Sequence, residues 1–282
     1  MDCENHYEKG PVTSLQNHYE KARRIKIEGH RGGRLDYENT LNAYQLAIDH
    51  KLDSIEFDIW LTRDKVPIVI HGAENGTLFH DSEVGDIPQG SLFNDLTLEQ
   101  LKGVVLPNGQ AIPTFEELLD LCIGKIYLNC EIKEKNVEVC HILMDILKAR
   151  NVTNKDLHFS SFKHFQLEEL KRMDPSFECS YLYEPWDEMI PDEYMSHGDI
   201  ISINHHVMTK EIVDNCHKSG KKVAVWFSAQ YPESIEYYPS LIEYGIDILI
   251  TDKPIEFQEF IANLQPDVST DAIQNKITQA TT

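Results

Sequence analysis

Short runs of β-branched residues alternate along the chain with stretches of helical periodicity. Eight runs are predicted to be strands: Ile25–His30, Ser54–Ile59, Lys125–Ile132, Leu157–Phe162, Glu178–Tyr183, Asp199–Asn204, Lys222–Phe227 and Ile248–Thr251. Periodicity and capping residues predict helices between them: Thr40–Asp49, Thr114–Cys122, Val137–Arg150, Gln166–Met173, Thr209–Ser219 and Ser234–Tyr244. Strand followed by helix, many times over, predicts an α/β fold, a TIM (β/α)8 barrel, with a doubly wound open sheet as the alternative.

The second predicted strand leads into a hairpin, SIEFDIWLTRDKVPIVIH. A turn centred on Asp64 and Lys65 would return the chain antiparallel and place His71 directly across from Asp58. This turn is too short for a parallel crossover. We therefore expect the hairpin to extend the second strand and to lead into a turn-rich insertion, about residues 72–112, that forms a small subdomain over the barrel mouth.

The ends of the chain are polar and weakly patterned, so residues 1–22 and 265–282 are expected to be tails, although Ala272–Ile277 could add a helical turn. The barrel is expected over residues 23–264. A composition of 41% hydrophobic residues allows a sizeable core. Without a linker or a long repeat, one domain with an insertion is preferred to two domains.

The formal net charge of −21 argues against nucleic acid as a partner and against docking on anionic membranes. No apolar run approaches the length of a membrane span, and the amino terminus has no apolar signal core, so we expect no stable membrane insertion and a cytoplasmic location. The six cysteines form no CxxC pair and are expected to be reduced and mostly buried.

Polar and charged residues gather where the first three predicted strands end. Residues at the carboxyl ends of barrel strands surround one site, so we expect convergence of His30, Arg31, Glu56, Asp58, Glu131 and Lys133, with His71 returning through the hairpin. Three crowded carboxylates raise one another's pKa unless a cation joins them. Oxygen ligands favour Mg²⁺ or Ca²⁺ over zinc. The alternative for each acid alone is an ordinary surface ion pair.

Several segments, in this order, resemble the glycerophosphodiester phosphodiesterase family: HRGGRLDYENT, IEFDIWLTRDKVPIVIH, LNCEIK, FSSF, GKKVAVW and GIDILITDKP. The resemblance spans about His30 to Pro254. It implies a TIM barrel with an insertion after the second strand. It also implies metal-dependent hydrolysis of glycerophosphodiesters to glycerol 3-phosphate and an alcohol such as choline or ethanolamine.

Residue by residue, the resemblance implies Glu56, Asp58 and Glu131 as metal ligands. It implies His30 and His71 as the acid–base pair. It also implies Arg31 and Lys133 as partners of the phosphate oxygens.

Other residues near the predicted strand ends have two interpretations. Trp226 could offer an apolar wall to glycerol or a lipid chain, or be a core tryptophan. Glu38 and Asn39 could hold the His30 loop or only cap the following helix. Asp252 is expected to fix the last strand-to-helix turn, a structural role.

The sequence departs from the family pattern beside the predicted site. Gly72 follows His71 where an acid is usual, and a common Arg-Thr-Thr segment is absent. These departures leave the substrate open. A lysophospholipase D type activity on lysophospholipids and a non-catalytic glycerophosphoryl-binding protein are the alternatives, and retention of both histidines speaks against the second.

Overall fold

The computed structural model describes residues 12–78, 87–88, 90–184 and 198–265. Its strands form one sheet in the order β1-β9-β8-β7-β6-β5-β4-β2-β3, closed by pairing of β1 with β2. The eight parallel barrel strands are β1 (Lys26–Gly29), β2 (Ser54–Leu61), β4 (Tyr127–Ile132), β5 (Leu157–Ser161), β6 (Cys179–Tyr183), β7 (Ile200–Asn204), β8 (Lys222–Trp226) and β9 (Ile248–Thr251). The predicted closed TIM barrel is confirmed.

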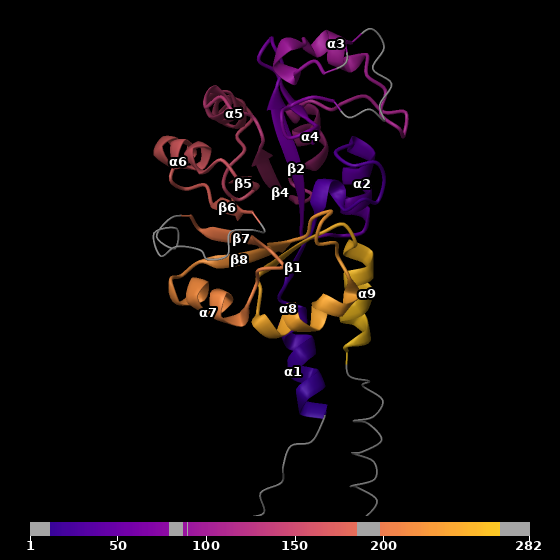
Figure 1. Cartoon of the computed structure of the whole chain (residues 1–282), viewed down its shortest axis with the longest axis vertical. Helices are drawn as coiled ribbons and strands as arrows, with labels where there is room; N and C mark the ends of the chain where they lie inside the picture. Colours follow the sequence, from indigo (N-terminus) through magenta and orange to yellow (C-terminus); the bar gives the residue numbers. More distant parts are fainter. Residues whose placement is uncertain (1–11, 79–86, 89, 185–197, 266–282) are drawn as a thin grey trace, which may run out of the picture.

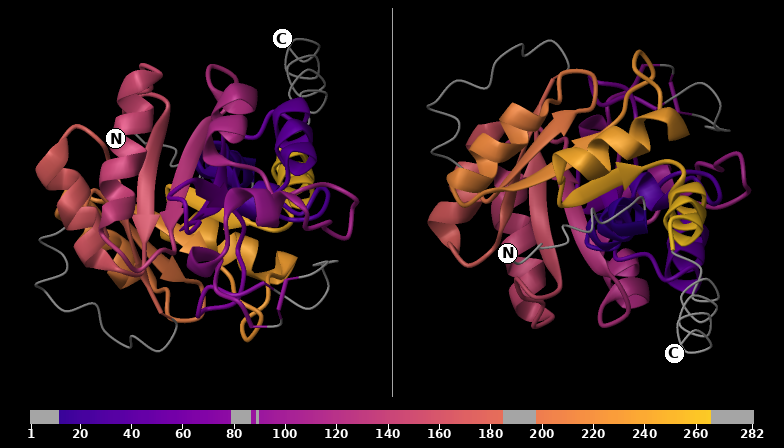
Figure 2. Two further views of the ribbon diagram at one scale, coloured as in Figure 1. Left: turned by 90° about the horizontal axis from the view of Figure 1, so that it is seen from above. Right: turned by 90° about the horizontal axis from the view of Figure 1, so that it is seen from below.

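Helices surround the strands (Figures 1 and 2). The α-helices within the described ranges are α1 (Val12–Ala22), α2 (Leu41–Asp49), α3 (Leu98–Lys102), α4 (Phe115–Cys122), α5 (Glu138–Ala149), α6 (His164–Met173), α7 (Lys210–Lys218), α8 (Tyr238–Tyr244) and α9 (Pro254–Asn263). Three short 3-10 helices are η1 (His30–Gly32), η2 (Phe93–Asp95) and η4 (Ile235–Tyr237). In the part of the chain that is described, no helix has both the length and the apolar character needed to cross a membrane.

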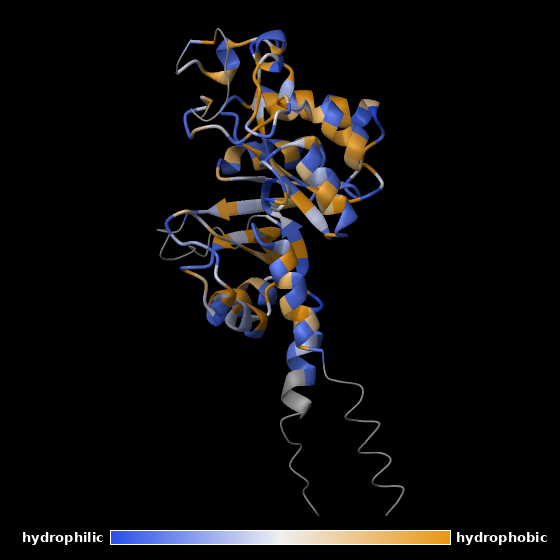
Figure 3. Ribbon diagram, turned by 90° about the vertical axis from the view of Figure 1, so that its right-hand side faces the viewer, coloured by the Kyte–Doolittle hydropathy of each residue, from blue (hydrophilic) through white to orange (hydrophobic). Residues whose placement is uncertain are grey.

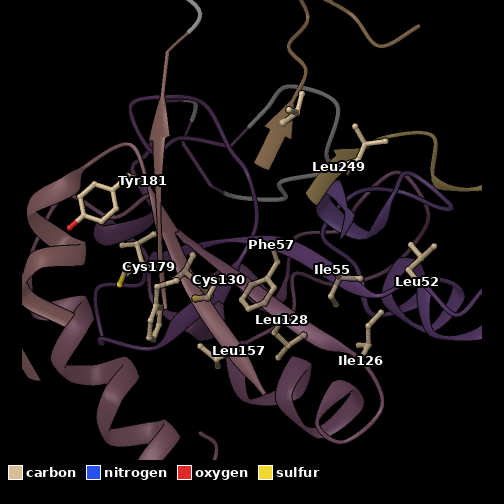
Figure 4. Packing of buried hydrophobic residues seen from close by; sticks show 14 of the residues in the cluster. Leu52, Ile55, Phe57, Ile126, Leu128, Cys130, Leu157, Cys179, Tyr181 and Leu249 are labelled. Carbon is tan, nitrogen blue, oxygen red and sulfur yellow. The ribbon is translucent and has the colours of Figure 1, made fainter. Parts of the chain in front are cut away.

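Capping residues and an outward apolar layer explain these elements. Thr40 accepts the N–H of Ala43 at the start of α2, and Thr114 forms a capping box with Glu117 at α4. Residues such as Phe57 point outward from the strands and form the core between barrel and helices (Figure 4). The helices carry both hydrophobic and hydrophilic positions (Figure 3), as expected for elements with one buried face.

The amino-terminal segment departs from the prediction. The tail expected over residues 1–22 includes α1, so this prediction is wrong for Val12–Ala22. Tertiary contacts hold the helix, because Ala22 is fully buried and Lys21 pairs with Glu243 of α8 at 2.9 Å. Helix α9 was also not predicted as an element. The possible turn at Ala272–Ile277 lies outside the described residues.

The register of the hairpin differs from the predicted one by one residue. In β3 (Pro67–Val69), Val69 pairs with Ile59, and the Ile70 N–H donates to the Asp58 carbonyl at 3.1 Å. His71 therefore does not lie directly across from Asp58. The turn contains three residues instead of two, with Lys65 in the left-handed region at φ 65°. A three-residue turn with one left-handed residue shifts the register in this way.

The insertion has a hydrophobic cluster of its own, separate from the main core. Its buried members are Trp60, Ile68, Ile70, Phe93, Leu96, Leu101, Val104, Leu106 and Ile112. Gly72 lies at the edge of this cluster with φ 64°, and a Cβ at this position would come within 2.5 Å of the Phe93 ring. The residue after His71 must therefore be glycine for Phe93 to pack as it does.

The inside of the barrel is arranged in layers to which alternate strands contribute. The pairing registers assign Glu28, Asn129, Ser180 and Ala224 to one layer, then Glu56, Ser160, Ser202 and Ile250, then Glu131, Leu182 and Trp226, and finally Asp58, Phe162 and Asn204. The strand order places β4 opposite β8 and β2 opposite β7. Trp226 thus faces Glu131 across the barrel, and Asn204 faces Asp58.

Candidate active site

Three carboxylates from two neighbouring strands meet at the carboxyl end of the barrel. Asp58 of β2 pairs in register with Glu131 of β4, and Glu56 lies two residues earlier on the same face. One oxygen of each carboxylate lies within 4.8 Å of the others, and all three residues are buried. Among the described residues, Glu56 Oε1, Asp58 Oδ1 and Glu131 Oε1 accept no hydrogen bond. These buried, unpaired oxygens are the donor set that a hard divalent cation binds.

The electrostatics show strain within this group of acids. Burial raises the pKa of Glu56 well above its usual range, and the Asp58 and Glu131 charges raise it further. Burial likewise raises the pKa of Glu131, although Lys133 opposes it. Burial also opposes ionisation of Asp58, yet its pKa is lowered because His71, Arg31 and Lys133 surround it. Asp58 is therefore the carboxylate that stays charged, and the other two carry the cost of crowding.

Arg31 and Asn39 orient the acids from the loop after β1. The Arg31 N–H donates to Glu56 Oε2 at 2.9 Å, and its guanidinium Nε lies 3.4 Å from Asp58 Oδ2. The same guanidinium donates to both oxygens of Glu38, at 3.0 and 3.1 Å. Asn39 donates from Nδ2 to Asp58 Oδ2 at 2.8 Å. This leaves the second oxygen of Asp58 for a ligand.

His30 is oriented by a residue from the other end of the sequence. Its Nδ1 lies 2.8 Å from Asp252 Oδ1, and because a carboxylate can only accept, Nδ1 carries the proton. The other nitrogen, Nε2, lies 4.0 Å from Glu56 Oε2 and faces the group of acids. Arg34 holds Asp252 from its other side, with Nε 3.1 Å from Oδ2. The Asp252 side chain thus does more than the turn-fixing role expected of it.

His71 and Lys133 lie together on the opposite flank. Lys133 Nζ is 3.5 Å from His71 Nε2 and 3.4 Å from Glu131 Oε1. Burial opposes a charge on Lys133, but the Glu131 and Asp58 carboxylates raise its pKa. Burial lowers the pKa of His71 to about 3 despite the Asp58 charge, so this imidazole is neutral at pH 7. A neutral imidazole can accept a proton.

The predicted site residues come together, with Trp226 on the far wall. Trp226 packs on the inner cluster Ile200, Ala224, Ile248 and Ile250, and its ring meets Phe162 edge-to-face at 5.5 Å. It is partly exposed at the barrel mouth. Both earlier interpretations thus hold for different parts of this side chain.

The sequence gave only a weak signal for Asp252 and for the contact between Asn39 and Asp58. Both contacts join segments far apart in the chain, 222 residues for His30 and Asp252. Position at the end of a barrel strand was the available signal for Asp252, and a short TDKP turn gave an equally good structural account.

Comparisons with known proteins agree with this geometry. The profile of the glycerophosphoryl diester phosphodiesterase family matches residues 30–256. The chain is 32% identical over 246 residues to a glycerophosphodiester phosphodiesterase of Caldanaerobacter subterraneus subsp. tengcongensis, covering 81% of this chain and 94% of that protein.

Two solved structures share the fold. A phosphodiesterase of Oleispira antarctica, in complex with the product sn-glycerol-3-phosphate, has a TM-score of 0.73 at 23% identity and covers 84% of this chain and 96% of its own. A glycerophosphodiester phosphodiesterase of Thermotoga maritima has a TM-score of 0.65 at 23% identity, covering 84% and 98%. The chain belongs to the glycerophosphoryl diester phosphodiesterase family and is a phosphoric diester hydrolase.

Proposed function

We propose that this protein hydrolyses glycerophosphodiesters to glycerol 3-phosphate and an alcohol, with a divalent cation and two histidines. One observation carries the proposal: three buried carboxylate oxygens without hydrogen-bond partners lie within 4.8 Å of one another, between two histidines. The name of the Caldanaerobacter relative supports the reaction. The expected cytoplasmic location belongs to the same proposal and rests on the sequence alone.

The donor set fits a magnesium or calcium ion held by Glu56, Asp58 and Glu131. Both ions prefer oxygen ligands, and three carboxylates leave coordination positions for water and substrate. When bound, such a cation would neutralise the crowded acids and stabilise negative charge on a phosphate oxygen.

The remaining residues have roles that follow from their contacts. His30 presents Nε2 to the reacting phosphate and is oriented through Nδ1 by Asp252. His71, neutral and on the other flank, takes up or releases the second proton. Lys133 offers a cation to the phosphate oxygens. Arg31 is already engaged by Glu38 and Asp58, so it contributes charge and holds the acids in place.

The substrate test uses glycerophosphocholine and lysophosphatidylcholine, each with and without a chelator. We expect chelator-sensitive release of glycerol 3-phosphate from the first substrate and its loss in Glu56→Ala and His30→Ala. Full activity in either variant would overturn the proposed site. Hydrolysis of the acylated substrate alone would identify a lysophospholipase D type activity. Binding without hydrolysis of either would identify a non-catalytic glycerophosphoryl-binding protein.

A further inference from the structure

Two buried N–H donors on the wall opposite the acids have no acceptor among the described residues. They are Asn204 Nδ2, at the end of β7, and Trp226 Nε1, at the end of β8. The two residues are register partners on adjacent strands. Ile203 and Val225, which alternate with them, belong to the outer core, so Asn204 and Trp226 face into the barrel.

The orientation of the Asn204 amide is fixed by its own loop. Oδ1 accepts the N–H of His206 at 3.0 Å, which turns Nδ2 away from that contact and toward the barrel. Asn204 is fully buried. A buried donor without an acceptor is costly. Two such donors side by side therefore indicate a subsite for an oxygen atom.

The position of this subsite selects which part of a substrate can reach it. Trp226 shares a layer with Glu131, and Asn204 shares one with Asp58, on opposite sides of the barrel. A phosphodiester held at the acids has its phosphate on the β2 and β4 side. The group that reaches β7 and β8 must then be a polar group several bonds from phosphorus.

The chemistry of the donors selects among such groups. The quaternary ammonium of choline cannot accept a hydrogen bond, and the ammonium of ethanolamine only donates. The terminal hydroxyl of glycerol has an oxygen that can accept, and it is the glycerol hydroxyl farther from phosphorus. We propose that Asn204 and Trp226 form a subsite that binds the terminal hydroxyl oxygen of the glycerol moiety and so select glycerol esters. This inference rests on the proposed function.

The test compares glycerophosphocholine with 2-hydroxypropyl phosphocholine, which lacks only the terminal hydroxyl. Trp226→Phe keeps the ring packing and removes the N–H. We expect it to lower kcat/KM for glycerophosphocholine about 2- to 10-fold, the effect of one neutral hydrogen bond, and to leave the analogue unchanged. The wild type should lose a similar factor on changing to the analogue. Asn204→Leu should behave like Trp226→Phe, with thermal unfolding measured because the His206 N–H loses its acceptor.

Ser180→Ala is the matched control, since it removes another buried hydroxyl without a partner from a lower layer of the same barrel. It should change neither substrate's kinetics. Binding of glycerol 3-phosphate and of 2-hydroxypropyl phosphate, followed by calorimetry, gives a readout without turnover. Equal losses on both substrates in Trp226→Phe would overturn the inference and leave the proposed function intact. A wild type inactive on both substrates would overturn the proposed function itself.

Discussion

Glu28 is a buried carboxylate whose charge nothing in the described structure compensates. It is 1% exposed inside the barrel and forms no ion pair among the described residues. Ser54 Oγ donates to Oε2 and Asn129 Nδ2 donates to Oε1, both at 2.7 Å. Burial raises its pKa, and these two hydrogen bonds offset burial only in part. The folded state therefore binds a proton at Glu28 more tightly than the unfolded state does.

The sign of the pH effect follows. With a raised pKa in the folded state, the contribution of Glu28 to stability is fully present below its unfolded pKa and is lost as pH rises through the folded pKa. Glu28→Gln removes this loss. The new amide can accept from Ser54, and its NH₂ can donate to Asn129 Oδ1, which has no partner now, once the Asn129 amide turns.

We expect Glu28→Gln to match the wild type near pH 5 and to raise the free energy of unfolding at pH 8. The gain should be about 1 to 3 kcal/mol, the cost of an uncompensated buried polar group. For a chain of this size that corresponds to roughly 2 to 12 °C in the melting temperature.

The assay is thermal and urea unfolding from pH 5.5 to 8.5 in the presence of a chelator. The control is Glu259→Gln, an exposed change on α9 that removes the same formal charge. It should show no pH-dependent difference from the wild type. A Glu28→Gln protein that is less stable than the wild type by the same amount at every pH would refute the reasoning.

Three further predictions concern the site. Mg²⁺ or Ca²⁺ at 100 times its dissociation constant should stabilise the protein by about 2.7 kcal/mol in thermal unfolding, and Glu131→Gln should abolish the shift. Asp252→Asn should lower kcat at least about tenfold, within the 10²–10⁴ that acid–base catalysis supplies, with little change in KM; an unchanged kcat would exclude a positioning role toward His30. Asn39→Ala should weaken metal affinity about 10- to 100-fold by calorimetry, because Asp58 loses a bond of 2.8 Å, and unchanged affinity would contradict that role.

The barrel was predictable because its strands carry local signals. Each predicted strand overlaps an observed one, since a β-branched run with alternation on one face needs no knowledge of its partners. Helix α1 was missed for the opposite reason: its sequence is polar, and packing against α8 stabilises it. A prediction from local pattern cannot see such a contact.

The candidate site divides in the same way. Glu56, Asp58 and Glu131 could be predicted because strand alternation and parallel register decide where they point. The position of His71 could not be derived from symmetry, because one left-handed residue in the turn, Lys65, shifts the hairpin register by one. The pairing of His30 with Asp252 depends on closure of the barrel, which brings β1 beside β9.

The two histidines are held by different parts of the chain, and this separates what each part of the sequence can change. His30 depends on barrel closure, through Asp252 at the end of β9. His71 depends on the insertion, because Trp60 Nε1 donates to its carbonyl at 3.0 Å and Gly72 allows Phe93 to pack against the chain directly after it. The insertion therefore does more than cover the mouth. Its small hydrophobic cluster fixes one of the two proton-transfer groups, so sequence changes there act on the acid–base pair without touching the carboxylates.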